Sequence, residues 1–185
     1  MFNPYFVVRE SKMLPGVRGA FAIRDIPKGT QIIQYKGKLI SKELSERISS
    51  KHREKGELWV FTLSETQDVD GSRQGNAARY INHSCEPNCE AVNYDNEEIW
   101  IEAKQDIKKG EELTYNYGFE EPDEAFPCLC QSKNCKKWIV EEDYVVSPDE
   151  HDELLRKQKE FLEENHGVED QTHFAVKKAK KAKQQ

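Results

Sequence analysis

The chain has 185 residues, of which 36% are hydrophobic and 34% charged, and its formal net charge is −6. This length favours one domain with short extensions, and the negative charge argues against a protein that coats nucleic acid. We expect a soluble intracellular protein without membrane contact, because no run approaches the roughly 20 apolar residues of a membrane span and the N-terminus lacks the features of a signal peptide.

The first 140 residues predict short strands separated by turns, such as the one at Pro27-Lys28-Gly29. A charged stretch at 41–55, in which Leu44 and Ile48 lie four residues apart, predicts a surface helix. Runs rich in aromatic and β-branched residues predict strands. These strands are expected at residues 5–10, 21–24, 31–35, 59–63, 99–103 and 113–117. Many short strands with few helices indicate a β-rich α+β fold.

The composition changes after Val146. Ser147, Pro148 and Glu150 form the pattern of a helix N-terminus with a capping box. The helix predicted at 147–166 has an apolar face, formed by Leu154, Leu155, Phe161 and Leu162. This face either docks on the domain, the reading we favour, or binds a partner, which could be a second copy of the chain. The end of the chain, from Lys177 to Lys183, is expected to be a disordered tail that binds nucleic acid at most weakly.

Amides, an imidazole and thiols are concentrated in residues 79–89, with the sequence RYINHSCEPNC, which we call the Asn-His segment. Burying such groups is costly unless they have hydrogen-bond partners or a chemical task. A polar loop with a satisfied buried histidine would account for Asn82 and His83 considered alone. The cysteines that follow favour a functional interpretation.

Cys128, Cys130 and Cys135 form a C-x-C-x₄-C pattern. In a reducing compartment this spacing favours thiolate ligation of zinc over disulfides. A structural zinc has four ligands, and the remaining cysteines are Cys85 and Cys89. We predict Cys85 as the fourth ligand. A closed shell of four thiolates leaves no open position for catalysis, so the zinc is expected to be structural.

Residues 79–88 resemble the central signature of SET-domain lysine methyltransferases, and residues 110–118, GEELTYNYG, resemble the final catalytic strand of that family. The three-cysteine segment is similar to its post-SET zinc segment, with some likeness to trithorax proteins at 75–79. The resemblance implies a SET fold of several small β-sheets with a knot-like C-terminal segment. It also implies a division into a SET domain at 5–118, a post-SET segment at 119–140, a helical extension at 141–166 and a tail at 167–185.

The resemblance implies methyl transfer from S-adenosylmethionine to the side-chain amine of a lysine. Free lysine has a pKa of about 10.4, so the site must desolvate the ammonium and align the neutral amine. By family position, Tyr117 is the catalytic tyrosine at the transfer point. Tyr35 would line the lysine channel and hold the amine. Tyr115 matches a phenylalanine/tyrosine switch that limits the number of methyl groups added.

The resemblance also implies a set of cofactor-binding residues: Val17, Arg18, Gly19, Trp59, Asn82, His83 and Trp138. Asn82 and His83 would lie beneath the adenine, and the tryptophans would offer aromatic surfaces for a purine. Two positions depart from the family pattern. Val17 stands where the first glycine of the cofactor motif is usual, and Lys38 stands where many members have an acid.

Two other functions remain open at this point. One is an inactive SET-like scaffold, although an inactive module has no physical reason to keep Asn82, His83, Tyr35 and Tyr117 together. The other is a zinc protein that binds nucleic acid, although the net charge has the wrong sign for strong phosphate binding. For a methyltransferase the expected substrate is a histone tail or another lysine-rich tail. The location would be nuclear in a eukaryote, and cytoplasmic or that of a secreted effector in a bacterium.

Overall fold

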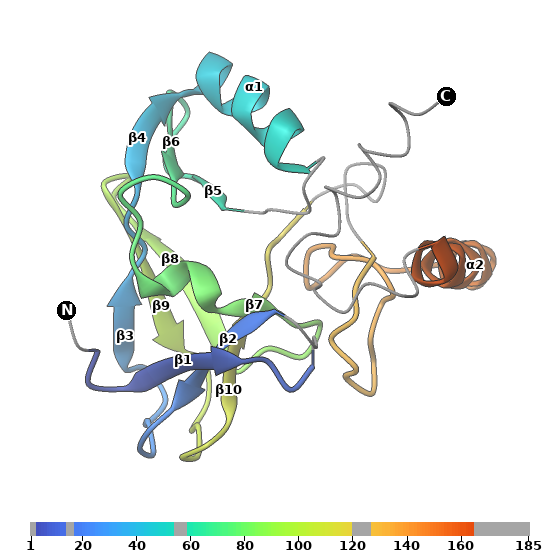
Figure 1. Ribbon diagram of the computed structural model, residues 1–185, viewed down its shortest axis with the longest axis horizontal. Helices are drawn as coiled ribbons and strands as arrows, with labels where there is room; N and C mark the ends of the chain where they lie inside the picture. The colour runs from blue at the N-terminus through green and yellow to red at the C-terminus, as the bar shows by residue number, and fades with distance from the viewer. Residues whose placement is uncertain (1–2, 14–16, 54–58, 120–126, 165–185) are drawn as a thin grey trace.

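The computed structural model describes residues 3–13, 17–53, 59–119 and 127–164 (Figure 1). Within these ranges the chain forms three small sheets, two α-helices and a short 3₁₀ helix. The expected β-rich α+β class is therefore confirmed. The first sheet has the order β1-β2-β10-β7, the second β3-β9-β8 and the third β4-β6-β5.

The first sheet joins strands from the N-terminal part of the chain to the Asn-His segment and to the predicted catalytic strand. Its strands are β1 (Phe6–Glu10), β2 (Arg18–Ala22), β10 (Glu112–Tyr115) and β7 (Asn82–His83). The pairing of β7 with β10 is parallel and places Thr114 opposite Asn82 and Tyr115 opposite His83. This register brings the Asn-His segment beside the run of tyrosines that ends the predicted catalytic strand.

The second sheet supplies much of the main core. It contains β3 (Gln31–Gln34), β9 (Glu98–Ala103) and β8 (Cys89–Tyr94). In β9, Ile99, Ile101 and Ala103 are buried and alternate with more exposed residues, as expected of a strand with one face on a core. Asp95 and Asn96, with φ values of 53° and 59°, connect β8 to β9. Positive φ at both positions is typical of a tight hairpin turn.

The third sheet lies beside helix α1 at one side of the molecule (Figure 1). It contains β4 (Lys38–Ser41), β6 (Gln67–Asp70) and β5 (Val60–Thr62), and α1 spans Lys42–Arg53. The Lys42 ammonium lies 2.6 Å from the carboxylate of the buried Asp68, which ties the first turn of the helix to β6. The sequence predicted α1 and β5 but missed β4 and β6, as well as β7, β8 and the 3₁₀ helix η1 (Ala77–Tyr80).

Two predicted strands differ from the observed bounds by two residues or more, and the other four differ by one. The second strand begins at Arg18 instead of residue 21 because it pairs along its whole length with β1. The last strand ends at Tyr115 instead of residue 117. There the Asn116 side chain accepts a hydrogen bond of 2.7 Å from the Gly118 backbone N–H, and this turn replaces the ladder.

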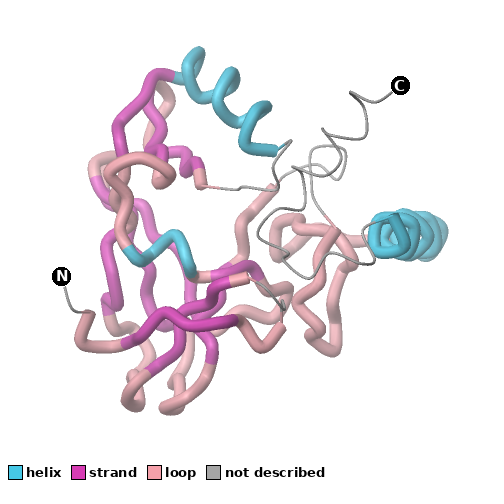
Figure 2. Tube along the Cα trace, in the orientation of Figure 1, coloured by secondary structure: helices cyan, strands magenta, loops and turns pink. Residues whose placement is uncertain are grey.

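Residues 127–147 run as loop between the sheets and helix α2 (Figure 2). Helix α2 spans Pro148–Glu164 and begins with the predicted capping box. Ser147 Oγ accepts from the Glu150 backbone N–H at 3.3 Å, and Glu150 Oε2 accepts from the Ser147 N–H at 3.4 Å. Neither described helix has the length and apolar character needed to cross a membrane.

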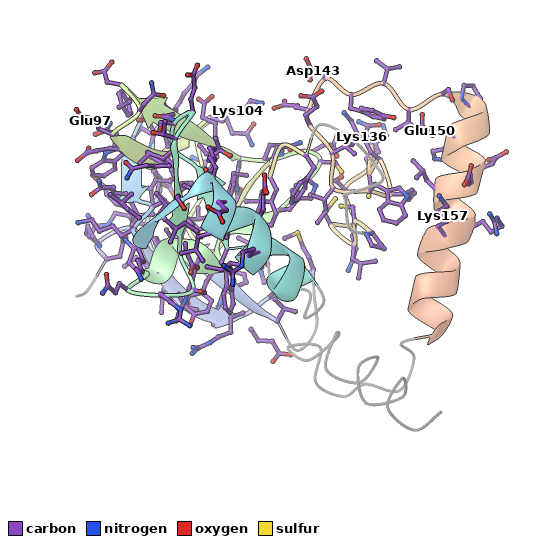
Figure 3. All side chains as sticks on the ribbon, turned by 90° about the horizontal axis from the view of Figure 1, so that it is seen from above. Glu97, Lys104, Lys136, Asp143, Glu150 and Lys157 are labelled. Carbon is purple, nitrogen blue, oxygen red and sulfur yellow. The ribbon has the colours of Figure 1, made fainter. Side chains whose placement is uncertain are left out.

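Helix α2 stands to one side of the sheets, with Lys136 near the loop that leads into it (Figure 3). On its predicted apolar face, Leu154 is buried whereas Leu155 is 36% exposed. The side chains of Phe161 and Leu162, and the whole tail from residue 165, lie outside the described residues. Whether this face binds a partner stays a prediction, as do the domain boundaries.

Candidate active site and metal centre

Three tyrosines and one phenylalanine, drawn from three distant segments of the chain, pack together. The ring of Phe61 lies 4.8 Å from that of Tyr35 and 5.6 Å from that of Tyr115, measured between centroids. Tyr115 and Tyr117 are in turn 4.8 Å apart. We call these four residues the aromatic cluster. The structure brings the three predicted tyrosines together, whereas Phe61 was not predicted; the roles of the tyrosines in a lysine channel stay predictions.

Backbone carbonyls fix two of the phenol groups. Tyr35 Oη donates to the carbonyl of Trp59 at 2.9 Å, and Tyr117 Oη donates to that of Ile81 at 3.2 Å. Burial raises the pKa of both phenols well above the usual value. Burial also raises the pKa of Tyr115. All three therefore stay neutral at physiological pH and act as dipoles instead of bases.

Asn82 and the carboxylate of Glu112 join the start of β2 to the Asn-His segment. Asn82 Nδ2 donates to the carbonyl of Arg18 at 3.1 Å and to Glu112 Oε1 at 2.9 Å. The same carboxylate accepts from Ser11 Oγ at 2.8 Å. A Cβ at position 19 would lie 2.2 Å from Glu112 Oε1, so glycine is needed for this close approach. The sequence placed Arg18, Gly19 and Asn82 in one site but gave no signal for Glu112.

Beside Asn82 and Arg18, two guanidinium groups pack on aromatic rings. The Cζ of Arg79 lies 5.0 Å from the ring centroid of Tyr80 and 5.7 Å from that of Trp59, and the Cζ of Arg18 lies 5.3 Å from the Tyr80 ring. Arg79 also donates to Tyr80 Oη at 3.0 Å, which lowers the pKa of Tyr80. The Nε of Arg79 is buried without a hydrogen-bond partner in the described part of the chain. Guanidinium groups in this arrangement can bind an anionic group.

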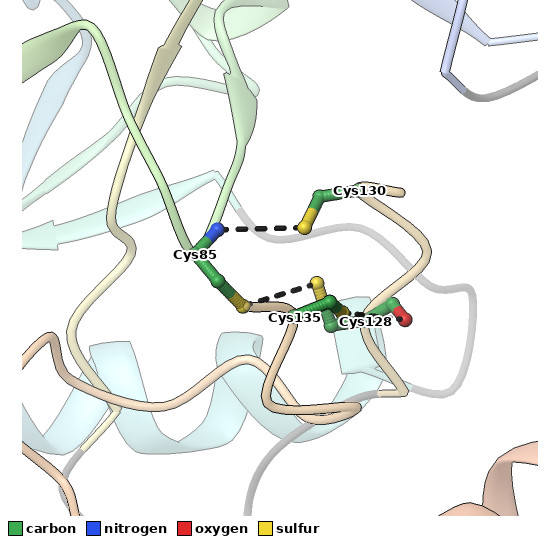
Figure 4. Close-up of side chains that lie close together, drawn as sticks. All are labelled: Cys85, Cys128, Cys130 and Cys135. Carbon is green, nitrogen blue, oxygen red and sulfur yellow. Dashed lines mark hydrogen bonds between the residues drawn. The ribbon is translucent and has the colours of Figure 1, made fainter. Parts of the chain in front are cut away.

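Four cysteines point toward one another between the Asn-His segment and the later loop (Figure 4). The sulfurs of Cys85, Cys128, Cys130 and Cys135, which we call the sulfur cluster, all lie within 4.8 Å of one another. Cys85 Sγ and Cys128 Sγ are 3.6 Å apart. Tetrahedral zinc with sulfur ligands at about 2.3 Å would give sulfur separations of about 3.8 Å. The cluster therefore contains the four predicted cysteines in a geometry that fits such an ion.

The electrostatics of the sulfur cluster favour a cation. Hydrogen bonds from the thiols of Cys128, Cys135 and Cys85 lower the pKa of Cys130. The pKa of Cys128 is raised, chiefly because its thiol is hydrogen-bonded to the neighbouring sulfurs, with Cys130 first among them, and also because it is buried. Four thiolates can coexist here only around a positive ion. Cys89 is buried apart from the cluster, and burial raises its pKa to about 12. All five cysteines are free thiols, as expected.

The aromatic and sulfur clusters meet at Tyr117 and His83. Tyr117 packs against buried Cys85, Cys128, Cys130 and Ile139, and its ring lies 5.5 Å from that of His83. Burial lowers the pKa of His83 to about 4, so its imidazole is neutral at physiological pH. Trp138 forms an isolated bridge with Pro127 in the loop that carries the cysteines, and its buried Nε1 has no hydrogen-bond partner within the described residues.

Some predicted cofactor residues come together more closely than others. Arg18 lies on β2, and Asn82 and His83 lie on β7, with β10 between the two strands. The Asn82 side chain bridges them through its hydrogen bond to the Arg18 carbonyl, and Trp59 lies against Arg79. For Val17 the structure gives a backbone hydrogen bond of 2.7 Å from Ser11 to its carbonyl. Trp138 lies on the cysteine loop, and its place at a cofactor stays a prediction. Arg79 was missed as a site residue, although it begins the Asn-His segment.

Comparison with known proteins agrees with these observations. The family model described as SET domain matches residues 17–118. Histone-lysine N-methyltransferase trr of Drosophila melanogaster is 45% identical over 127 residues, which cover 65% of this chain and 5% of that protein. Histone-lysine N-methyltransferase 2D of Homo sapiens is 39% identical over 127 residues, covering 65% of this chain and 2% of the relative.

A further relative comes from Schizosaccharomyces pombe. It is named histone-lysine N-methyltransferase, H3 lysine-4 specific, and is 36% identical over 126 residues, covering 65% of this chain and 14% of that protein. The chain therefore spans only a small part of the length of the curated relatives it matches.

Proposed function

The chain belongs to the SET domain family, and from this premise we propose that it is a protein-lysine N-methyltransferase that transfers a methyl group from S-adenosylmethionine to a lysine side chain. The observation that carries the proposal is the aromatic cluster itself, in which Tyr35 and Tyr115 pack on Phe61 and Tyr117 packs on Tyr115, beside Asn82 and His83. These residues come from four distant segments, and ordinary packing does not require three phenols at one point.

The aromatic cluster suits the chemistry of the acceptor. A lysine ammonium that enters an apolar lining loses hydration, which lowers its pKa and favours the neutral nucleophile. S-adenosylmethionine supplies an activated methyl group on a sulfonium. The lysine ammonium would first release its proton to solvent. A nitrogen–carbon bond would then form as the carbon–sulfur bond breaks, giving a methylated ammonium and a neutral thioether as the leaving group.

The hydrogen bonds within the cluster leave oxygen lone pairs available for the reactants. Because the Tyr35 hydroxyl donates its hydrogen bond to the Trp59 backbone carbonyl, the Tyr35 oxygen can accept a hydrogen bond from the lysine amine. Because Tyr117 donates to Ile81, its oxygen can accept weak C–H hydrogen bonds at the transfer point. The Tyr115 hydroxyl would occupy the remaining space and limit the number of methyl groups.

The described residues fit the cofactor. The guanidinium groups of Arg18 and Arg79 would face its carboxylate, and the Nε of Arg79 is a buried donor that still lacks a partner within the described ranges. The backbone of Val17 and Gly19 would border the cofactor, with Asn82 and His83 beneath the adenine. Trp59 and Trp138 would supply the aromatic surfaces.

The sulfur cluster would hold a structural zinc, because its four cysteines supply thiolate ligands at suitable separations. The ion would fix the loop that carries Trp138 against the Asn-His segment, so zinc supports the cofactor site from outside the reaction.

We propose a histone tail as the substrate. The named activities of the relatives support this choice, and an acidic chain favours a lysine-rich partner. Since the S. pombe relative is named for lysine 4 of H3, that residue is the first target to examine. A histone substrate would place the protein in the nucleus of a eukaryote. Any contact with nucleic acid through the lysine-rich tail is expected to be weak.

The test is incubation of the zinc-loaded protein with isotope-labelled S-adenosylmethionine and a panel of separate histones. We expect label on the lysine of a histone tail, identified by tandem mass spectrometry, and far less label with Tyr117→Phe. Calorimetric titration with the cofactor accompanies the assay. No heat of binding would favour the inactive scaffold, and binding without transfer to any histone would remove the histone from the proposal.

A further inference from the structure

The His83 side chain is held between a backbone amide and a sulfur. It lies on β7 and is 5% exposed. Its Nδ1 accepts a hydrogen bond of 3.2 Å from the backbone N–H of Tyr117. A ring nitrogen that accepts a hydrogen bond carries no proton, so the imidazole must carry its proton on Nε2.

The protonated nitrogen faces the sulfur cluster. Nε2 of His83 lies 3.6 Å from Sγ of Cys85, which also lies 3.4 Å from the donating backbone N–H of Lys136. A metal-bound thiolate has no proton to donate and can only accept. With Nε2 as the donor, the contact becomes a hydrogen bond from imidazole to thiolate.

We propose that His83 is a positioning residue that couples the metal centre to Tyr117 through this single tautomer. Nδ1 of the ring fixes the backbone just beyond the end of β10, and Nε2 stabilises the Cys85 thiolate. The coupling rests on the proposed function for its effect on catalysis, whereas its structural part stands on the two contacts alone. It also gives the imidazole a task separate from contact with adenine.

The geometry supports a coupling that runs in both directions. The ladder between β7 and β10 pairs Tyr115 with His83, and the Ser84 backbone N–H then donates to the Tyr115 carbonyl at 3.2 Å. Beyond this bond the Tyr117 backbone N–H donates to Nδ1, so the His83 ring helps to fix the Tyr117 backbone. When the sulfurs are protonated and the ion is absent, Nε2 loses an anionic acceptor and the ring is held less firmly.

The wild-type protein provides the first test. With ¹⁵N-labelled histidine and cadmium-113 in place of zinc, long-range ¹H–¹⁵N spectra should show His83 with a protonated Nε2 and a bare Nδ1. A scalar coupling between that Nε2 proton and cadmium-113 should report the hydrogen bond to the thiolate. A proton on Nδ1, or the absence of this coupling in the metal-loaded protein, would overturn the proposal without any measurement of activity.

Two substitutions separate the hydrogen bonds of the two ring nitrogens. In His83→Asn the amide oxygen can take the place of Nδ1, but no group reaches the thiolate. In His83→Gln the amide nitrogen can take the place of Nε2, but Tyr117 loses its acceptor. His151→Asn is the matched control, since that residue lies on α2 and its side chain is 44% exposed.

Loss of an outer hydrogen bond to a metal ligand typically lowers metal affinity by 10–100-fold. We expect a loss of about that size for His83→Asn in chelator competition, with little change for His83→Gln and His151→Asn. We expect the larger fall in kcat for His83→Gln. Equal metal affinity in both His83 variants would refute the coupling. If the spectra and affinities agree but no lysine is methylated, the proposed function fails while the coupling stands.

Discussion

The tightest packing at the aromatic cluster involves a glycine. A Cβ built on Gly71 would lie 2.3 Å from Oη of Tyr35 and 2.8 Å from its Cζ. Favourable contacts between carbon atoms begin near about 3.5 Å. Gly71→Ala must therefore move the Tyr35 ring by roughly 1 Å. The ring cannot yield easily, because it is 4% exposed and packs on Phe61.

The displacement has a cost in stability and a cost in rate. Overpacking a core typically costs about 1–3 kcal/mol, and losing the hydrogen bond from Tyr35 to Trp59 adds roughly 0.5–1.5 kcal/mol. We expect Gly71→Ala to lower the free energy of unfolding by about 2–4 kcal/mol in urea titrations. A shift of 1 Å at a reacting group can cost about 100-fold in rate, so kcat should fall by about that factor while cofactor affinity changes little.

The control is a double-mutant cycle. Tyr35→Phe removes the Oη that lies nearest to the new Cβ, so the double variant Gly71→Ala/Tyr35→Phe should lose less stability than the sum of the single variants. Strict additivity would show that the alanine destabilises the protein by another route. A Gly71→Ala protein with unchanged kcat would remove Tyr35 from its proposed place at the amine.

Four further outcomes follow from the structure. Tyr117→Phe should lower kcat by about 100-fold with cofactor affinity retained in calorimetry, and unchanged turnover would exclude its role at the transfer point. Tyr115→Phe should raise the number of methyl groups per lysine, and an unchanged product distribution by mass spectrometry would refute the switch. Cys130→Ser should lower bound zinc, and chelation of the wild type should lower its Tm; full metal occupancy in the variant would contradict the assigned shell. Lys136→Met removes an ammonium that donates to the carbonyls of Glu141, Glu142 and Tyr144 at 2.9, 2.6 and 2.8 Å. Hydrogen exchange of 141–150 should become faster, and unchanged protection would show that the amine does not hold this loop.

Strands with strong apolar character could be predicted from the sequence, whereas weaker ones could not. In β9 the isoleucines alternate with less buried residues, and the pattern was sufficient. Its partner β8 presents mostly polar or half-buried residues, and pairing with β9 determines its conformation. The Asp95-Asn96 dipeptide was the available signal for the hairpin, since both residues tolerate positive φ.

Some residues of the site could likewise be predicted from the sequence, and others could not. The cysteine spacing and the tyrosine motif predicted the two clusters, because the chemistry resides in the residue types themselves. Glu112 was missed because its role depends on Ser11, which lies 101 positions earlier, and on Asn82. Phe61 was missed because a phenylalanine in a strand reads as core. Only the fold shows that its ring joins Tyr35 to Tyr115.

Tyr117 connects the two parts of the site energetically as well as spatially. Its ring packs against the main apolar core and also against the buried cysteines of the sulfur cluster. The main core contains residues such as Phe6, Ile101 and Leu113 that have no link to the metal. Loss of the ion should therefore disturb the position of Tyr117 before it unfolds the sheets. During a chelator titration, methyl transfer should disappear while the far-ultraviolet circular dichroism of the sheets persists, and simultaneous loss of both signals would show that the metal stabilises the whole fold.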